Sequence, residues 1–175
     1  SEEGHQLRAE WGVTRDEVIW MAGSTHEGEE SLLLRAWLRL RGSVRARLFL
    51  VPRHTNRVAS VAKDVEKAGL SWVLRSELKT DSPREAVVIV DTMGELARLF
   101  AASDVVVLGG TLVPVGGHNI LEPAAEARMV VLGPHFWTIR DAATDLIEAK
   151  AARVVDDEDG LVEVMAPLLE ESLLR

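Results

Sequence analysis

The chain has 175 residues, of which 47% are hydrophobic and 27% are charged, a composition typical of a globular domain and not of a disordered segment. Its formal net charge is -8 at pH 7, which argues against a protein that coats nucleic acid, because such proteins need a basic surface. The absence of cysteine excludes disulfides and thiolate metal sites. The chain begins at Ser1 and not at Met, and we expect it to be part of a longer protein.

Short apolar runs alternate along the chain with longer amphipathic segments. The runs are continuous, which is typical of strands in a parallel sheet that helices cover on both faces. The sequence therefore predicts strands at residues 18–23, 48–51, 70–74, 86–90, 105–108, 129–132 and 152–155.

The amphipathic segments between these runs have helical spacing. Val58, Val61, Ala62 and Val65 recur along one of them, and Gly69 follows as a helix C-cap. Alternating strands and helices imply right-handed crossovers and an α/β fold with a Rossmann-like, doubly wound parallel sheet. We expect helices at residues 27–40, 55–68, 94–102, 120–127, 139–150 and 158–169.

Two parts of the chain are distinguished by this pattern. We expect residues 1–16 to form a linker or a residual interdomain helix, and residues 17–175 to form one Rossmann-like domain that binds a nucleotide sugar. In open parallel sheets, ligands bind beyond the carboxyl ends of the strands. Polar, glycine-rich or basic segments follow four of the predicted strands, at residues 23–30, 52–57, 91–96 and 109–123.

The last of these segments contains the run Gly116-Gly117-His118-Asn119, for which ligand binding is favoured. The two glycines permit close backbone approach, and free N–H groups where a helix begins at Asn119 would suit a phosphate. Glu122 lies three residues further on, where its carboxylate could accept the hydroxyls of a ribose. The alternative for Asn119 and Glu122 is a capping box, and the sequence leaves it open.

Two basic residues follow the second strand. Arg53 is expected to bind a phosphate or carboxylate, because guanidinium groups form paired hydrogen bonds with such anions. Arg57 lies one helical turn further on and could assist. The alternative is that these arginines solvate the start of a helix or pair with Glu95.

Residues after the fourth and first strands complete the predicted site. Met93, Gly94 and Glu95 could flank a base or a sugar, although Glu95 could equally stabilise a helix start and Met93 could fill the core. Ser24 and Thr25 offer small hydroxyl donors where the first strand ends.

Histidines also follow the strands, but they do not predict a metal site. His26, His54 and His118 lack the spacing of metal ligands on one helix, so we expect no metal. His26 could contact a sugar or simply sit at a helix start. The sequence also lacks a Walker motif, a G-x-S-x-G elbow and a G-x-G-x-x-G run after the first strand.

At these loops the sequence resembles the 3-deoxy-D-manno-octulosonic acid (Kdo) transferases, family 30 of the glycosyltransferases. The resemblance extends from about Val18 to the end of the chain, and it departs from the family pattern at residues 136–139. The matching runs are Gly-Ser-Thr-His-Glu-Gly-Glu-Glu (23–30), Pro-Arg-His-x-x-Arg (52–57), Asp-Thr-Met-Gly-Glu-Leu (91–96) and Gly-Gly-Thr-Leu-Val-Pro-Val-Gly-Gly-His-Asn-Ile-Leu-Glu-Pro (109–123).

The resemblance implies the carboxy-terminal half of a two-domain GT-B enzyme, which binds the donor CMP-Kdo without a metal cofactor. The amino-terminal half would bind the lipid A precursor and carry the general base, so no catalytic residue is expected in this chain. The whole enzyme would lie at the cytoplasmic face of the bacterial inner membrane. The substrate-binding residues expected here are Ser24, Thr25, Arg53, His54, Met93, Gly94, Glu95, Gly116, Gly117, His118, Asn119 and Glu122.

Three alternatives remain open from the sequence. Another GT-B enzyme that uses a UDP-sugar would share the fold and the glycine-rich loop followed by a glutamate. A non-enzymatic nucleotide-binding domain would bind ligand without needing a partner domain. A structural half-domain without a ligand is least favoured, because it leaves the glycine-rich loops unexplained.

Overall fold

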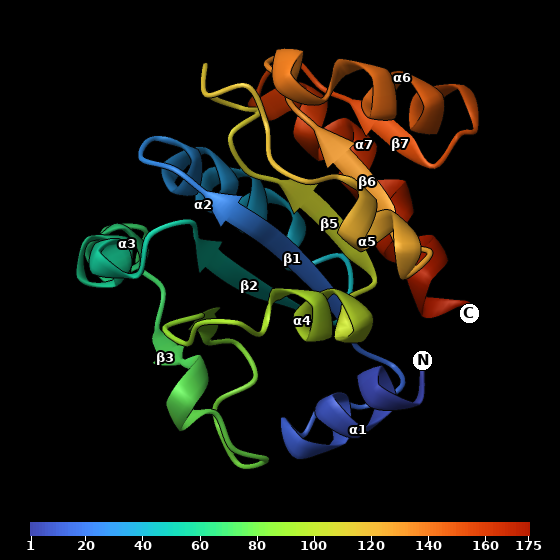
Figure 1. The fold of residues 1–175 in the computed structure, drawn as a ribbon. Coiled ribbons are helices and arrows are strands. Elements are labelled where there is room, and N and C mark those ends of the chain that lie inside the picture. Colours follow the sequence, from blue (N-terminus) through green and yellow to red (C-terminus); the bar gives the residue numbers. More distant parts are fainter.

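Seven parallel strands form one sheet, in the order β3-β4-β2-β1-β5-β6-β7 (Figure 1). The computed structural model describes residues 1–175. The sheet grows from β1 in both directions, toward β2 and toward β5, so the predicted doubly wound topology is confirmed. The strands are β1 (Val18–Thr25), β2 (Ala46–Pro52), β3 (Trp72–Leu74), β4 (Val87–Ile89), β5 (Val105–Leu108), β6 (Met129–Leu132) and β7 (Ala152–Val154).

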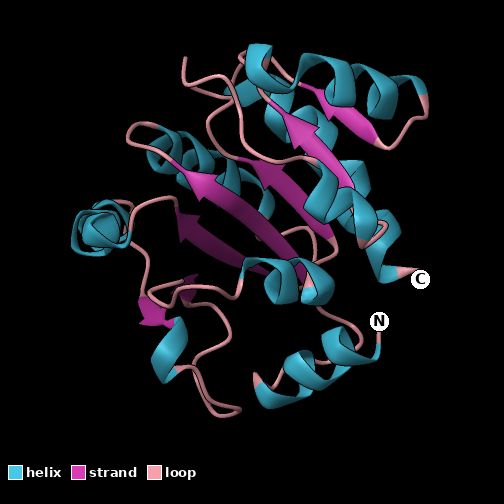
Figure 2. Ribbon diagram, viewed as in Figure 1, coloured by secondary structure: helices cyan, strands magenta, loops and turns pink.

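Helices cover both faces of the sheet, as Figure 2 shows. Alternate residues of β1 belong to different cores: Trp20 packs in a cluster with residues of α2, α3 and α7, whereas Met21 packs with residues of α1 and α4. Burial on both sides explains why the strands are continuously apolar. The helices are α1 (Glu2–Glu10), α2 (Glu29–Leu40), α3 (Val58–Lys67), α4 (Leu96–Ala102), α5 (Leu121–Ala125), α6 (Arg140–Glu148) and α7 (Glu158–Leu173), with short 3-10 turns η1 (Thr55–Arg57), η2 (Arg75–Glu77) and η3 (Trp137–Ile139).

Residues 1–16 pack against the same body. Leu7 and Trp11 are buried in the core that α4 covers, and a Cβ on Gly4 would come within 2.1 Å of the carbonyl oxygen of Ala101. The helix α1 therefore lies directly on the backbone of α4. The proposed role of this segment as an interdomain linker stays a prediction.

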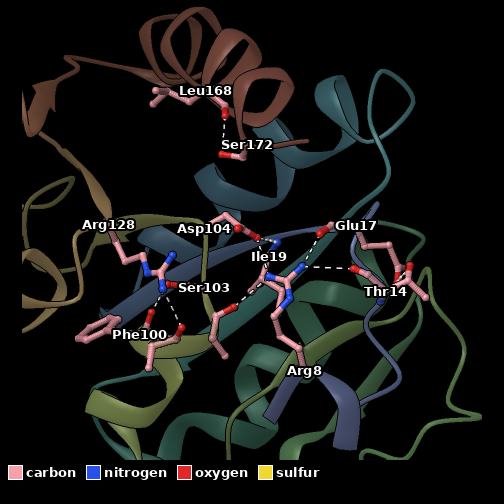
Figure 3. Close-up of polar contacts among 12 residues, drawn as sticks. Arg8, Thr14, Glu17, Ile19, Phe100, Ser103, Asp104, Arg128, Leu168 and Ser172 are labelled. Atoms are coloured by element: carbon pink, nitrogen blue, oxygen red, sulfur yellow. Dashed lines mark hydrogen bonds and ion pairs between the residues drawn. The ribbon is translucent and has the colours of Figure 1, made fainter. Parts of the chain in front are cut away.

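An arginine joins α1 to the amino edge of the sheet, where the strands begin (Figure 3). Arg8 donates to Asp104 Oδ2 at 2.8 Å and to the carbonyl oxygen of Glu17 at 2.5 Å. The same oxygen of Asp104 accepts the N–H of Ile19 at 2.7 Å. These bonds satisfy backbone groups where the strands β1 and β5 begin.

A second ion pair at the amino edge is fully buried. The side chains of Glu17 and Arg47 lie 3.6 Å apart, and Arg84 reaches the other oxygen of Glu17 at 3.1 Å. Burial raises the pKa of Glu17, but hydrogen bonds from Thr14 and the two guanidinium groups outweigh it and hold the pKa below its ordinary value. This carboxylate is therefore bound by groups of the protein itself.

The elements match the expected order, and most of their bounds differ from the predicted ones by one to four residues. The strand β1 runs two residues beyond the prediction, through a bulge after Gly23, so that Thr25 pairs with Pro52. The helix α4 begins at Leu96, because Gly94 has a φ of 75° that no helix allows. The helix α5 has only five residues. None of the helices combines the length and apolar character that a membrane-spanning helix requires.

Candidate functional site

A cavity of about 600 Å³ opens at the carboxyl edge of the sheet, where the strands β1, β2, β4 and β5 end. Its volume is in the range of pockets that hold small ligands. Val51, Leu99 and Phe100 are among its apolar residues. Of the predicted site residues, the cavity gathers Ser24, Arg53, His54, Met93, Gly94, Glu95, His118, Asn119 and Glu122.

The other three predicted residues do not line this cavity. Thr25 is only 1% exposed within β1, and Gly116 and Gly117 lie deeper in the glycine-rich loop. Their contact with a ligand stays a prediction. Conversely, three polar residues of the lining were quoted in the loops but not selected: Thr55, Asn56 and Thr92. Their only signal in the sequence was their position after a strand.

Ser24 has a backbone conformation that is rare for residues other than glycine, with a φ of 58°. The neighbouring strand comes very close here: a Cβ on Gly109 would lie 2.1 Å from the carbonyl oxygen of Ser24. Strained residues of this kind cluster at functional sites. In this conformation Ser24 lines the cavity although only 6% of the residue is exposed.

The two arginines after β2 have different roles. Arg57 donates to Glu30 Oε1 at 2.5 Å, and the side chain of Glu30 is completely buried. Arg53 is exposed at the cavity, and its guanidinium forms no hydrogen bond or ion pair within the chain, although its backbone N–H donates to the carbonyl oxygen of Thr25 at 2.9 Å. Only Arg53 is therefore free to bind an anion, while Arg57 neutralises a buried carboxylate.

Glu29, in the first turn of α2, holds the glycine-rich loop in place. Its carboxylate accepts the backbone N–H of His26 at 2.9 Å, of Gly110 at 2.7 Å and of Leu112 at 3.1 Å. Burial raises the pKa of Glu29, and the three N–H donors offset this only in part. Its position in the first turn of α2 still agrees with the helix dipole.

Gly116 and Gly117 are required by packing inside the loop. Their φ values are 110° and 100°, and a Cβ on Gly116 would come within 2.7 Å of the ring of Trp137. A Cβ on Gly117 would lie 3.0 Å from Ile139. Both N–H groups donate to the carbonyl oxygen of Gly110, at 3.0 and 2.9 Å, and are not free for a phosphate in this conformation.

Asn119 and Glu122 are linked to each other at the rim of the cavity. Asn119 accepts the N–H of Leu121 at 2.9 Å through its side-chain oxygen, and its amide donates to Glu122 Oε1 at 3.2 Å. The residue before the helix is Ile120, so Asn119 is not the N-cap of the capping-box alternative. Both side chains are exposed toward the cavity and keep acceptor capacity for a ligand.

The segment after β4 forms one wall. Met93 is 82% exposed, and Gly94 has open space around it. Glu95 accepts from Thr92 and pairs with Arg75 at 3.2 Å, and so does not pair with Arg53 or Arg57 as one alternative held. An exposed thioether beside an open glycine suits the flat face of a base.

Three histidines that are far apart in the sequence meet at this edge. His26 Nε2 lies 2.6 Å from His118 Nε2, and the two ring planes are nearly parallel, at 6°. The ring of His54 stands edge-on to that of His26, with centroids 5.9 Å apart. Burial, with the nearby positive groups, holds the pKa of both His26 and His118 below the ordinary value. No group of three or more His, Cys, Asp or Glu side chains is arranged to hold a metal ion.

The fold and sequence match known glycosyltransferase domains, although no protein-family model matches the chain. The chain is similar to the C-terminal CMP-Kdo binding domain of WaaA from Acinetobacter baumannii, with a TM-score of 0.84 and 30% identity over 97% of this chain and 89% of that one. A glycosyltransferase from Rickettsia africae, 12% identical with a TM-score of 0.65, shares the fold.

Full-length relatives are similar in sequence. The 3-deoxy-D-manno-octulosonic acid transferase of Bordetella pertussis is 34% identical over 94% of this chain, and that of Haemophilus influenzae is 34% identical over 97%. The chain spans 39% and 40% of the lengths of these two curated relatives. The chain therefore belongs to the Kdo transferase family of GT-B glycosyltransferases and corresponds to its carboxy-terminal domain.

Proposed function

We propose that this chain binds CMP-Kdo, as the donor domain of a Kdo transferase in lipopolysaccharide biosynthesis. The observation that carries the proposal is the convergence of Arg53, Asn119 and Glu122 in one cavity at the carboxyl edge. An unpaired guanidinium suits the phosphate or the sugar carboxylate, and a carboxylate beside an amide suits the two ribose hydroxyls. The similarity to the CMP-Kdo binding domain of Acinetobacter baumannii supports the choice of donor.

Within the cavity, each wall has a proposed partner on the donor. Arg53 and His118 face the phosphate or carboxylate, and Asn119 and Glu122 face the ribose. Met93 and Gly94 flank the cytosine, with Glu95 behind them. Ser24 and His54 face the sugar, and the backbone near Gly116 and Gly117, outside the cavity lining, is proposed to approach it as well.

The activity of the whole protein is part of the proposal. The lipid hydroxyl attacks the anomeric carbon of Kdo, and CMP leaves with the electrons of the broken bond. Donors fixed near the departing phosphate stabilise the charge that it gains. The general base and the site for the lipid A precursor lie in an amino-terminal domain, at the cytoplasmic face of the inner membrane, and no metal cofactor takes part. This chain alone is then expected to bind nucleotide without transferring sugar.

The test is calorimetric titration of this chain with CMP, UMP and UDP. We expect preference for CMP, with a Kd on the order of 0.1–1 mM, typical of a site that lacks its facing domain. Glu122→Ala should weaken CMP binding about tenfold or more, because a charged group makes the ribose hydrogen bonds. Glu126→Ala is the matched control, since Glu126 lies on the same short segment but outside the cavity lining.

The nucleotide preference separates the alternatives. Preference for UDP would favour a GT-B enzyme that uses a UDP-sugar. Transfer of Kdo to a lipid A precursor by this chain alone would overturn the division between the two domains. Equal binding in the Glu122→Ala variant and the wild type would remove Glu122 from the ribose site.

A further inference from the structure

The contact between His26 and His118 restricts the protons that the two rings can hold. A hydrogen bond between two imidazole nitrogens needs one Nε2 with a proton and one without. At 2.6 Å, two Nε2–H groups cannot face each other, so the intact pair is neutral or carries one positive charge. The two rings therefore behave as one titrating unit with at most one extra proton while they stay in contact.

The backbone around the pair is shaped to keep this contact. Gly110 has a φ of 73°, and a Cβ there would lie 3.1 Å from both Cδ2 and Nε2 of His118, so the ring lies against a glycine. On the other side, Glu29 binds the N–H of both His26 and Gly110. One buried carboxylate thus fixes the backbone at both places on which the contact of the rings depends.

The charges around the pair are mostly positive on the side of the cavity. Arg53 and His54 come from the segment after β2, and both line the cavity with His118. Arg57 is neutralised by Glu30, and Glu29 is turned toward backbone N–H groups. Glu122, also in the cavity lining, is hydrogen-bonded to Asn119, and the exposed Glu27 follows His26. These positive groups disfavour a proton on the pair, and an anion bound in the cavity would favour one.

We propose that His26 and His118 form a proton-sharing pair that takes up a proton when the phosphate of the nucleotide enters the cavity. The inference rests on the proposed nucleotide-binding function and adds a residue that was not assigned to it. His118 lines the cavity and faces the ligand, while His26 acts through His118 as a positioning residue. The pair then supplies a positive charge only when the phosphate is present.

The probe for this inference is the methyl phosphodiester of cytidine 5′-monophosphate, compared with CMP itself. A phosphomonoester has its own ionisation near pH 6, which would mask a histidine. The phosphodiester keeps one charge throughout this range and has the same phosphate chemistry as the donor. Titration at pH 6, 7 and 8, in buffers with different ionisation enthalpies, measures both Kd and the number of protons taken up.

We expect the wild type to take up between zero and one proton, with binding that tightens toward pH 6 by at most tenfold per pH unit. His118→Gln should lose most of this pH dependence, because it removes the ring that lines the cavity. His26→Gln should keep a pH dependence, which is then that of the single ring of His118. His26→Gln should keep its binding at pH 8, because Gln can still hydrogen bond to His118. His5→Gln is the matched control, since His5 lies at the opposite edge of the sheet, and it should behave as the wild type.

A second measurement does not depend on a ligand. In the free protein, the histidine proton resonances of His26 and His118 should titrate in two separate steps, which merge into one ordinary step in either single variant. Nucleotide binding without proton uptake would contradict the proposed role of the His26–His118 pair and would leave the proposed function intact. No binding of CMP or its methyl ester at any pH would overturn both.

Discussion

The two edges of the sheet use the same kinds of charged residue in opposite ways. At the amino edge, Arg8 and Arg47 each have a carboxylate partner, Asp104 and Glu17. At the carboxyl edge, Arg53 has no partner within the chain and faces a cavity. The type of a charged residue therefore does not indicate a ligand site. What indicates it is whether the side chain already has a partner of opposite charge within the protein.

The carboxyl edge itself divides in the same way. Glu29 and Glu30 are completely buried; Glu29 accepts backbone N–H groups, and one oxygen of Glu30 accepts from Arg57. Arg53, His54 and Glu122 remain available at the surface of the cavity. An inner layer of buried, paired groups thus holds in position an outer layer of groups that are available to a ligand, which is what a preorganised site requires.

The largest effect is expected from the buried pair at the amino edge. Glu17→Ala leaves Arg47 buried without a partner, so the free energy of unfolding should fall by about 3–5 kcal/mol. Urea denaturation measures the change, with the exposed and unpaired Glu10→Ala as control. CMP affinity of the folded fraction should not change. A clear loss of affinity would show that the two edges are coupled.

The next test separates the two arginines of the carboxyl edge. Arg57→Ala should lower the free energy of unfolding by roughly 3 kcal/mol at neutral pH, because Glu30 loses its cation. Arg53→Ala should leave stability unchanged and weaken CMP binding by about 1.5–3 kcal/mol, the range for hydrogen bonds to a charged group. Each variant is the control for the other, and the reverse pattern would contradict the distinction between occupied and available groups.

A smaller effect is expected from the glycine-rich loop. Gly116→Ala forces a positive φ on alanine and a clash with Trp137, which should lower the free energy of unfolding by about 1–3 kcal/mol. Gly42→Ala is the control, because nothing lies within 4 Å of a Cβ there. Adding Trp137→Ala to Gly116→Ala should restore only the part of the stability lost to the clash with the Trp137 ring, because the Cβ still lies 2.8 Å from Cγ2 of Thr138. Full restoration would mean that the backbone strain costs nothing.

The smallest effect concerns the pH dependence of stability at the two edges. The folded-state pKa of Glu17 is lowered, so its contribution is present above the unfolded value of about 4.3 and is lost as the pH falls. The folded-state pKa of Glu29 is raised above its unfolded value, so the charged carboxylate lowers stability. The free energy of unfolding that depends on Glu29 therefore increases as the pH falls from 7 toward the unfolded pKa. Urea denaturation of Glu17→Gln and Glu29→Gln from pH 7 to 4 should show opposite trends relative to the wild type, and parallel trends would contradict the assignment.

Much of the fold was predictable because strands and helices leave local patterns in the chain. The apolar runs located every strand, and loop position identified nine residues that line the cavity. The predicted bounds were wrong where they depend on contacts with other parts of the chain. Ser24 and Thr25 extend β1 only because the bulge lets Thr25 pair with Pro52 of another strand.

The sequence by itself determined the doubly wound α/β class and the edge at which the site lies, because periodicity and strand ends are local properties. Only the tertiary structure decided which charges are already satisfied. Arg53 and Arg57 have the same chemistry and lie four residues apart, and a buried Glu30 on α2 distinguishes them. His26 and His118 became a pair because parallel β1 and β5 end side by side, which brings residues far apart in the chain within hydrogen-bonding distance.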